Sequence, residues 1–193
     1  MHHIHHTTAF ILGHVDTKEH DRFIVLFTKE LGVVRATVRG IRKLSSRLRY
    51  ALQDFSHARV DLVQGREVWR ITSATRLEEH IFHKQGQLVA FAKVLELIRR
   101  LIQGEESTPT VFTILEQFID FCTANENLSK EELLGLEYIT VLKILNELGY
   151  VAPEGIVTVY LLADISVEKV NEAYIDRNQI LSLINKTLGE TQL

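Results

Sequence analysis

Hydrophobic positions in the first 75 residues follow the two-residue spacing of β-strands. In the segment 57–64, Val60 and Leu62 alternate with Arg59 and Asp61, so one face is apolar and the other polar. The pattern predicts five strands, at 7–14, 22–29, 33–40, 57–64 and 67–74. One long basic connection lies between the third strand and the fourth. Five short strands favour a small closed barrel of the OB-fold type, with an SH3-like barrel as the alternative.

After residue 74 the spacing changes to that of helices. Apolar residues three and four positions apart predict a helix over 85–103; they are Leu88, Phe91, Ala92, Leu95 and Ile98. A second helix is expected to begin at Pro109, with Thr108 placed to cap it.

The rest of the chain predicts further helices. Ser129 with Glu132 three residues later is the signature of a capping box, and the helix that it opens is expected to run to Leu148. The apolar segment 156–163 fits a strand, and a last helix is expected over 176–188.

Together these patterns predict an α+β protein of two domains, an OB-fold-like barrel over 1–78 and an α-helical domain over 79–193. Hydrophobic residues make up 46% and charged residues 24% of the sequence, which is typical of soluble globular proteins. No apolar run is long enough to cross a membrane, and the first residues lack the apolar core of a secretory signal. The expected location is therefore the cytoplasm.

Charge is unevenly distributed along the chain. Residues 1–80 carry 13 Lys and Arg against 9 Asp and Glu, whereas residues 81–193 carry 9 against 16. Between positions 35 and 49 six basic side chains occur without an acidic one: Arg35, Arg39, Arg42, Lys43, Arg47 and Arg49. Such a cluster in a slightly acidic chain favours a polyanion as the partner of the first domain. The alternative is a solvated surface without a partner.

Aromatic side chains near this cluster would stack on nucleobases if they faced outward; the candidates are Phe27, Tyr50, Phe55 and Trp69. Phe27 and Trp69 lie among aliphatic neighbours in strands, which favours the core. Tyr50, at the end of the basic connection, is the one expected to be exposed, and we group it with the six cations as a candidate DNA-binding residue.

Motifs of common catalytic chemistry are absent from the sequence. It contains no glycine-rich phosphate loop, no nucleophile elbow and no His-Glu-x-x-His helix, so we expect neither an enzyme nor a cofactor. The acidic group of Asp16, Glu19 and Asp21 adjoins Lys18 and Arg22, which favours local ion pairing over a cation site. The single cysteine, Cys122, excludes an internal disulfide and a four-cysteine zinc site, and its apolar helical surroundings indicate a core residue.

Histidines occur in two settings. Four lie at the start of the chain, where we expect surface positions and no metal site: His2, His3, His5 and His6. His14, His20 and His57 are scattered through predicted strands and turns, where local hydrogen bonds are expected.

Several short motifs follow one another in a fixed order in the first 65 residues. They are Gly-His at 13–14, Glu-His-Asp-Arg at 19–22, Thr-x-x-x-Gly at 28–32, Arg-Ala-x-x-x-Gly at 35–40, Arg-Lys-x-x-Ser at 42–46 and Leu-Gln-x-Phe at 52–55. As an ordered set they resemble the N-terminal domain of the RecO family of bacterial recombination mediators. The helical remainder resembles that family only in type, mainly over 136–153. Many members carry a four-cysteine zinc module that this chain lacks, so metal-linked properties do not transfer.

The resemblance implies a protein that is not an enzyme. RecO-like proteins bind single- and double-stranded DNA and anneal complementary strands. They contact RecR and the single-strand-binding protein, and help load the recombinase at gaps. A nucleoid-associated place in the cytoplasm follows from this role.

The acidic helical half would have to bind the acidic, apolar-ended tail of a single-strand-binding protein through local cations. Lys93, Arg99 and Arg100, on the helix predicted over 85–103, are the candidates. The alternative is that Arg99 and Arg100 only complement the helix dipole. A different function also stays open, that of an adaptor whose basic loop binds an acidic protein partner.

Overall fold

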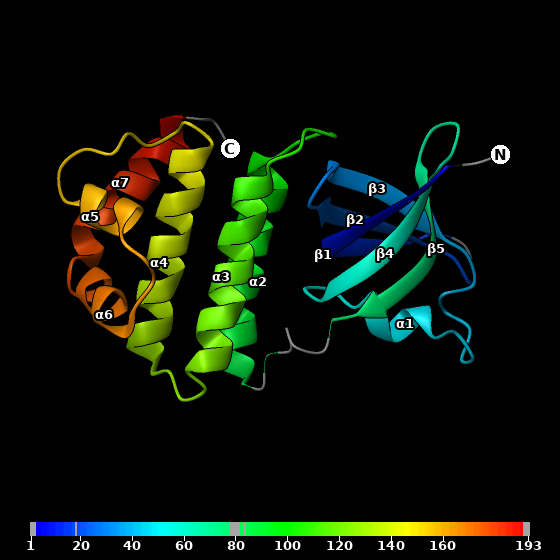
Figure 1. The fold of residues 1–193 in the computed structure, drawn as a ribbon, viewed down its shortest axis with the longest axis horizontal. Helices are drawn as coiled ribbons and strands as arrows, with labels where there is room; N and C mark the ends of the chain where they lie inside the picture. Colours follow the sequence, from blue (N-terminus) through cyan, green and yellow to red (C-terminus); the bar gives the residue numbers. More distant parts are fainter. Residues whose placement is uncertain (1–2, 18, 78–81, 83, 191–193) are drawn as a thin grey trace. The chain divides into compact units, whose positions relative to one another are not determined.

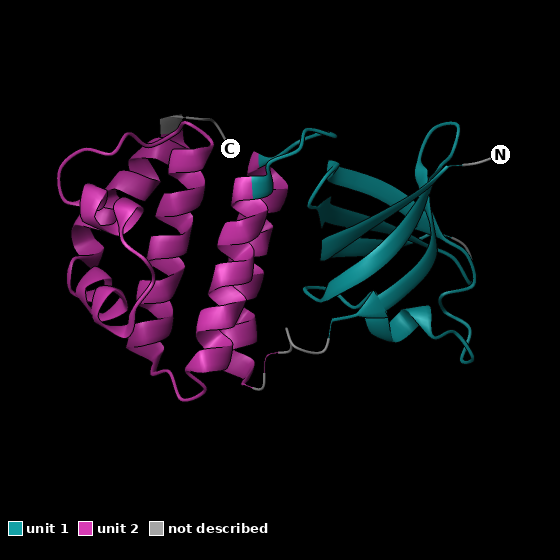
Figure 2. Cartoon of the chain, viewed as in Figure 1, with its two compact units in different colours: residues 1–81, 102–109 teal, residues 82–101, 110–193 magenta. Residues whose placement is uncertain are grey.

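The structure is a computed structural model that describes residues 3–17, 19–77, 82 and 84–190. The chain divides into two compact units (Figure 2). Unit 1 comprises residues 1–81 and 102–109, and unit 2 comprises residues 82–101 and 110–193. The boundary expected at residues 78–79 lies outside the described residues. Among the described helices, none has both the length and the apolar character needed to cross a bilayer.

Five strands of unit 1 form a closed barrel, as the strand pattern predicts (Figure 1). They are β1 (Ile4–Asp16), β2 (Arg22–Thr28), β3 (Gly32–Val38), β4 (His57–Gln64) and β5 (Trp69–Arg76). The strands are joined in the order β1-β2-β3-β5-β4, and β4 pairs with β1. Only the β3–β5 pair is parallel; the other neighbours are antiparallel.

Alternation along β2 and β3 separates the barrel interior from its outer face. Ile24 and Leu26 of β2 belong to the barrel core, as do three residues of β3: Val34, Ala36 and Val38. The residues between them, Phe23 and Val25 on β2 and Arg35 and Thr37 on β3, therefore lie on the outer face. The basic connection that follows β3 ends in a short helix, α1 (Leu48–Ala51).

Residues 102–109 pack with the barrel within unit 1. The Val33 amide donates a hydrogen bond to the Gly104 carbonyl at 3.1 Å. Gly32, at φ +68°, lies so close to this segment that a Cβ there would come within 2.2 Å of the Glu106 carbonyl oxygen. Both the positive φ and this contact require glycine at the β2–β3 turn.

Unit 2 is built from α-helices around an apolar core. They are α2 (Gln85–Leu101), α3 (Pro109–Ala124), α4 (Lys130–Glu147), α5 (Val157–Leu162), α6 (Val167–Ile175) and α7 (Arg177–Glu190), with the first residue of α3 assigned to unit 1. Phe91 of α2 and Phe118 of α3 have ring centroids 5.3 Å apart. Cys122 is buried on α3, as its apolar surroundings predict.

One helix-capping prediction is confirmed and one is wrong. The Glu132 amide donates to Ser129 Oγ at 3.1 Å, and the Ser129 amide donates to Glu132 Oε2 at 2.7 Å, which completes the capping box. Thr108 does not cap α3, because its Oγ1 is buried and has no hydrogen-bond partner among the described atoms.

The strand predicted over 156–163 is also wrong, because these residues form α5. Val157 and Tyr160 are buried three positions apart, whereas Val159 and Leu162 are exposed, so the segment follows the helical period. The Tyr160 hydroxyl donates a hydrogen bond to Asp176 Oδ2 at 2.6 Å. Helix α6 is not among the predicted elements, although Ser166 caps it in the usual way by accepting a hydrogen bond from the Lys169 amide.

Candidate nucleic-acid interface

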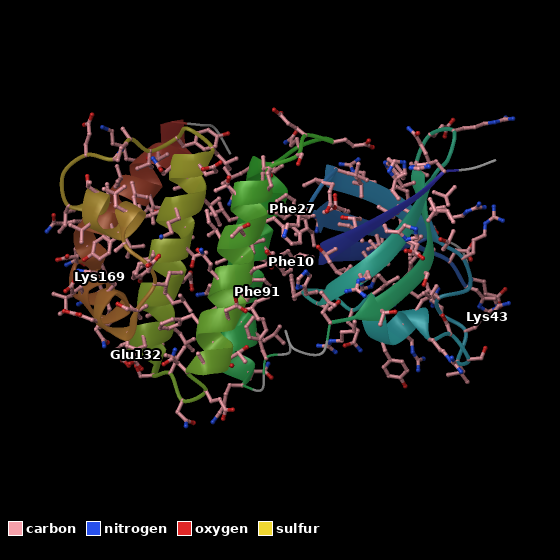
Figure 3. All side chains as sticks on the ribbon, viewed as in Figure 1. Phe10, Phe27, Lys43, Phe91, Glu132 and Lys169 are labelled. Atoms are coloured by element: carbon pink, nitrogen blue, oxygen red, sulfur yellow. The ribbon has the colours of Figure 1, made fainter. Side chains whose placement is uncertain are left out.

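The basic segment begins on the outer face of β3 and continues into a turn-rich loop at the edge of the barrel. Arg35, Arg39, Arg42, Lys43 and Arg47 are exposed, and Arg49 is half-buried in α1. Lys43 projects from this loop (Figure 3). The Lys43 amide donates to the Gly40 carbonyl at 3.1 Å, and the Ser46 amide donates to the Lys43 carbonyl at 3.0 Å. These local bonds hold the cations on one ordered loop.

The β1–β2 turn supports the start of this loop. Asp21 Oδ1 accepts a hydrogen bond from the Gly40 amide at 2.9 Å, and the His20 carbonyl accepts one from the Arg42 amide at 3.2 Å. Gly40 has φ +67°, a conformation that favours glycine. The acidic turn therefore positions the loop through backbone hydrogen bonds.

An ion-pair network joins the acidic turn to the basic loop. Arg22 Nε donates to Asp16 Oδ1 at 2.7 Å, and Arg42 Nε lies 3.6 Å from Asp16 Oδ2. The hydrogen bond from Arg22 lowers the pKa of the Asp16 carboxyl below its usual value, and the charges of both arginines act in the same direction. The ion pairing predicted for the acidic turn is confirmed for Asp16 with Arg22, and Lys18 lies outside the described residues. The pairing with Arg42 is new, and it partly neutralises one of the candidate DNA-binding cations.

A second group of cations lies on the β4–β5 hairpin. Arg66 and Arg70 line a groove of about 500 Å³, which Arg39 and Thr37 also line. Strand pairing explains the arrangement, since Thr37 of β3 is the direct partner of Arg70 on β5. Arg66 and Arg70 are isolated in the sequence, so the pattern of charge does not reveal them, and they join the cluster only through the β3–β5 closure.

The candidate aromatic residues differ in exposure. Phe27 and Trp69 are buried, as their strand context predicts. Trp69 Nε1 donates to Glu105 Oε1 at 2.8 Å, so its polar atom is satisfied. Tyr50 is 63% exposed, also as predicted, and the Arg49 guanidinium lies 5.5 Å from the centre of its ring. Phe55 is half-buried.

The histidines near the barrel form hydrogen bonds or ring contacts. His6 Nδ1 lies 2.7 Å from Asp61 Oδ1, and His14 Nδ1 lies 2.6 Å from Asp54 Oδ1. His57 is buried and stacks on Phe10, with ring centroids 4.2 Å apart. Among the residues that the structure describes, no three His, Cys, Asp or Glu side chains are placed to hold a metal ion. His2 lies outside the described residues.

The three candidate partner-binding cations of α2 divide between two faces. Lys93 and Arg100 line a groove of about 260 Å³, whose apolar lining includes Leu97 of α2, Val141 of α4 and Ile184 of α7. Arg99 is exposed but is not part of this groove. Lys93 Nζ lies 3.1 Å from Glu137 Oε2, so its charge is partly compensated.

Comparisons with known proteins show similarities that centre on the first unit. Residues 1–79 match the family model described as the N-terminal domain of recombination protein O. The chain is 31% identical over 121 residues to a DNA repair protein RecO from Myxococcus xanthus (strain DK1622), an alignment that covers 61% of this chain and 50% of the relative. It is 32% identical over 114 residues to a DNA repair protein RecO from Roseiflexus sp. (strain RS-1), covering 58% of this chain and 40% of the relative.

The aligned regions thus span half or less of the length of these curated relatives. They extend beyond the barrel, because both are longer than the 79 residues that match the family model. Residues 1–79, which include the closed barrel and its basic loop, therefore resemble the N-terminal domain of the RecO family.

Proposed function

We propose that this protein binds DNA through its barrel and acts as a mediator in recombinational DNA repair. The observation that carries the proposal is the row of exposed cations along β3 and the following loop: Arg35, Arg39, Arg42, Lys43 and Arg47. Cations on an ordered loop neutralise phosphates and release counterions, which gives salt-dependent affinity without sequence preference. The names of the two relatives, both DNA repair proteins, support the same role.

The groove beside Arg39 extends this surface. Arg66 and Arg70 add two cations on the β4–β5 hairpin. They line the same groove as Arg39, although they are far from the basic loop in sequence. Arginine binds phosphate through two parallel N–H groups, which suits it to this place better than lysine. The proposed DNA path therefore includes the loop and the hairpin groove.

Two finer activities follow from the family and belong to the proposal. By bringing complementary single strands together on its cations, the protein would anneal them, because neutralised phosphates no longer repel one another. By acting with a RecR-like protein and a single-strand-binding protein, it would help load the recombinase at single-stranded gaps.

The proposed site for the tail of a single-strand-binding protein is the groove of Lys93 and Arg100. An acidic peptide that ends in an apolar residue needs cations at the rim of an apolar floor, and Leu97, Val141 and Ile184 supply that floor. Arg100 is exposed and has no ion pair among the described residues, so its charge is available to a carboxylate.

Retention on immobilised single-stranded DNA tests the proposal. The protein should be retained at low salt and eluted as salt rises. The variant with Arg42→Ala, Lys43→Ala, Arg47→Ala and Arg49→Ala should elute much earlier. A control with the same loss of charge in unit 2, namely Lys84→Ala, Arg99→Ala, Arg100→Ala and Lys130→Ala, should elute with the parent. A parent that passes through DNA but is retained on polyglutamate would instead indicate an adaptor for acidic proteins.

A further inference from the structure

One partly exposed aromatic ring lies on the outer face of the barrel among the proposed phosphate-binding cations. Phe23 directly precedes the core residue Ile24 on β2. Because successive side chains of a strand point to opposite faces, Phe23 points away from the barrel interior. Its direct strand partners are Val15 of β1 and Thr37 of β3. Val15 is 59% exposed, and Phe23 is itself half-buried.

Cations flank this ring on the neighbouring strand. Arg35 is paired with Val25, two residues along β2 from Phe23, and Arg39 lines the hairpin groove together with Thr37. Both guanidinium groups are exposed, and neither forms an ion pair with another residue that the structure describes. Along the chain, Arg35 and Arg39 thus lie two residues to either side of Thr37, the strand partner of Phe23.

A row of paired residues continues from the ring into the hairpin groove. Phe23 pairs with Thr37, Thr37 pairs with Arg70, and Arg70 pairs with Val63. With roughly 4.8 Å between neighbouring strands, the backbones at Phe23 and Arg70 are about 10 Å apart. Thr37, Arg70 and Val63 also line the groove, so the ring and the groove form one continuous surface.

We infer that Phe23 stacks on one base of a single-stranded DNA segment that crosses β2 and β3 toward the hairpin groove. The inference rests on the proposed DNA binding and deepens it. A base within a duplex is stacked and paired, so it reaches an aromatic ring on a protein surface only at the cost of unstacking. The bases of a single strand are accessible, and an aromatic ring near arginines can stack on any of them regardless of sequence. The site therefore favours single-stranded over double-stranded DNA.

The competing explanation is that Phe23 only packs against Val15 to stabilise the sheet. Phe23→Leu separates the two, because leucine keeps the apolar cross-strand contact and removes the aromatic face. Anisotropy titrations of the full chain should use labelled oligo(dT), an abasic strand of the same length and a duplex. The Phe23→Leu variant should bind oligo(dT) roughly 5- to 100-fold more weakly than the parent, which is the range for one lost base stack.

The salt dependence and the two other strands supply the controls. Phe23→Leu should keep the salt slope of the parent and its affinity for the abasic strand and the duplex, because the phosphate contacts remain. Val15→Ala, which changes the exposed neighbour of the ring, should bind all three like the parent. Thermal unfolding should show that both variants fold.

A direct reporter is available at the same position. The sequence has one tryptophan, Trp69, which is buried, so a Phe23→Trp variant adds one exposed indole. Oligo(dT) should quench that indole, and the abasic strand should not. The inference is overturned if Phe23→Leu binds oligo(dT) as tightly as the parent while the parent still binds with a steep salt slope. The absence of salt-dependent binding in the parent would contradict the proposed function itself.

Discussion

Arg42 Nε lies 3.6 Å from Asp16 Oδ2, so one cation of the basic loop already faces a carboxylate before any DNA is bound. The same carboxylate accepts a hydrogen bond from Arg22 through its other oxygen. On the proposed DNA-binding surface, Asp16 would therefore compete with phosphate for Arg42 while it holds the loop against the β1–β2 turn. In the proposed complex this pair would limit the charge that Arg42 offers to a phosphate.

Replacing Asp16 with asparagine should raise the affinity for single-stranded DNA and steepen its salt dependence. The change removes the charge that competes for Arg42 and keeps a side-chain oxygen that accepts from Arg22. Binding titrations of the parent and the variant at several salt concentrations would check this. Equal affinity at low salt would show that Asp16 does not restrain Arg42.

Asp16 also gives a pH dependence with a defined sign. Its pKa is lowered in the folded protein, chiefly by the hydrogen bond from Arg22, so its stabilising contribution is present above the ordinary value of 3.8. It is lost as the pH falls below that value toward the folded pKa, where the carboxyl becomes protonated. Asp16→Asn should therefore reduce the acid sensitivity of unfolding, measured by denaturant titration across this range.

Trp69→Ala should lower the free energy of unfolding by about 3–5 kcal/mol, because it removes a large buried ring and leaves a cavity. Trp69 is 5% exposed, and its indole N–H is bonded to Glu105, so the substitution also leaves that carboxylate without its donor. Urea unfolding gives the comparison. A variant as stable as the parent that has lost DNA binding would instead assign Trp69 to the DNA surface.

Cys122 should react with thiol reagents only when the protein unfolds. Burial raises the pKa of its thiol to about 12, from an ordinary value of 9.0, so the reactive thiolate is suppressed in the folded state. Its stabilising contribution is complete below pH 9.0 and is lost as the pH rises from there toward about 12, since only the unfolded chain then gives up the proton. Rapid labelling at pH 8 without denaturant would contradict the burial of this thiol.

Arg100→Glu should weaken binding of an acidic, apolar-ended peptide by roughly fivefold or more, because it puts a like charge at the rim of the groove. Arg99→Glu is the matched control, since it makes the same charge change one residue away and outside the groove. Calorimetric titration of the peptide against both variants separates a local contact from the general charge of α2. Equal losses in the two variants would remove this groove as the peptide site.

Local patterns in the sequence are sufficient for most elements of the fold. Alternating residues predict the five strands, and the Ser129–Glu132 capping box fixes the start of α4, because both signals act within a few residues. The segment 156–163 is misassigned, because its β-branched residues favour a strand when read alone. In the structure these residues are helical, and Val157 and Tyr160 are buried together on one face, an outcome of tertiary packing that local propensity does not contain.

For the candidate site too, the sequence reveals what depends on local pattern and not what depends on tertiary structure. The six cations of β3 and the basic loop all lie between positions 35 and 49, so the pattern of charge in the sequence is enough to identify them. Arg70 and Phe23 reach the same surface only because β3 pairs with β5 on one side and with β2 on the other. Register of this kind depends on how the barrel closes, and strand propensity does not encode it. The pairing of Arg42 with Asp16 cannot be predicted from the sequence either, because it depends on how the basic loop folds against the β1–β2 turn.

The most direct test of the DNA-binding account is the slope of log affinity against log salt for a short single strand. If about six phosphates are neutralised, the slope of the parent should be roughly −4. The variant lacking Arg42, Lys43, Arg47 and Arg49 should have a slope smaller in magnitude by about 3, with the same loss of affinity for every base sequence. A folded variant with the slope and the affinity of the parent would contradict the account, because the loop would then not contact DNA.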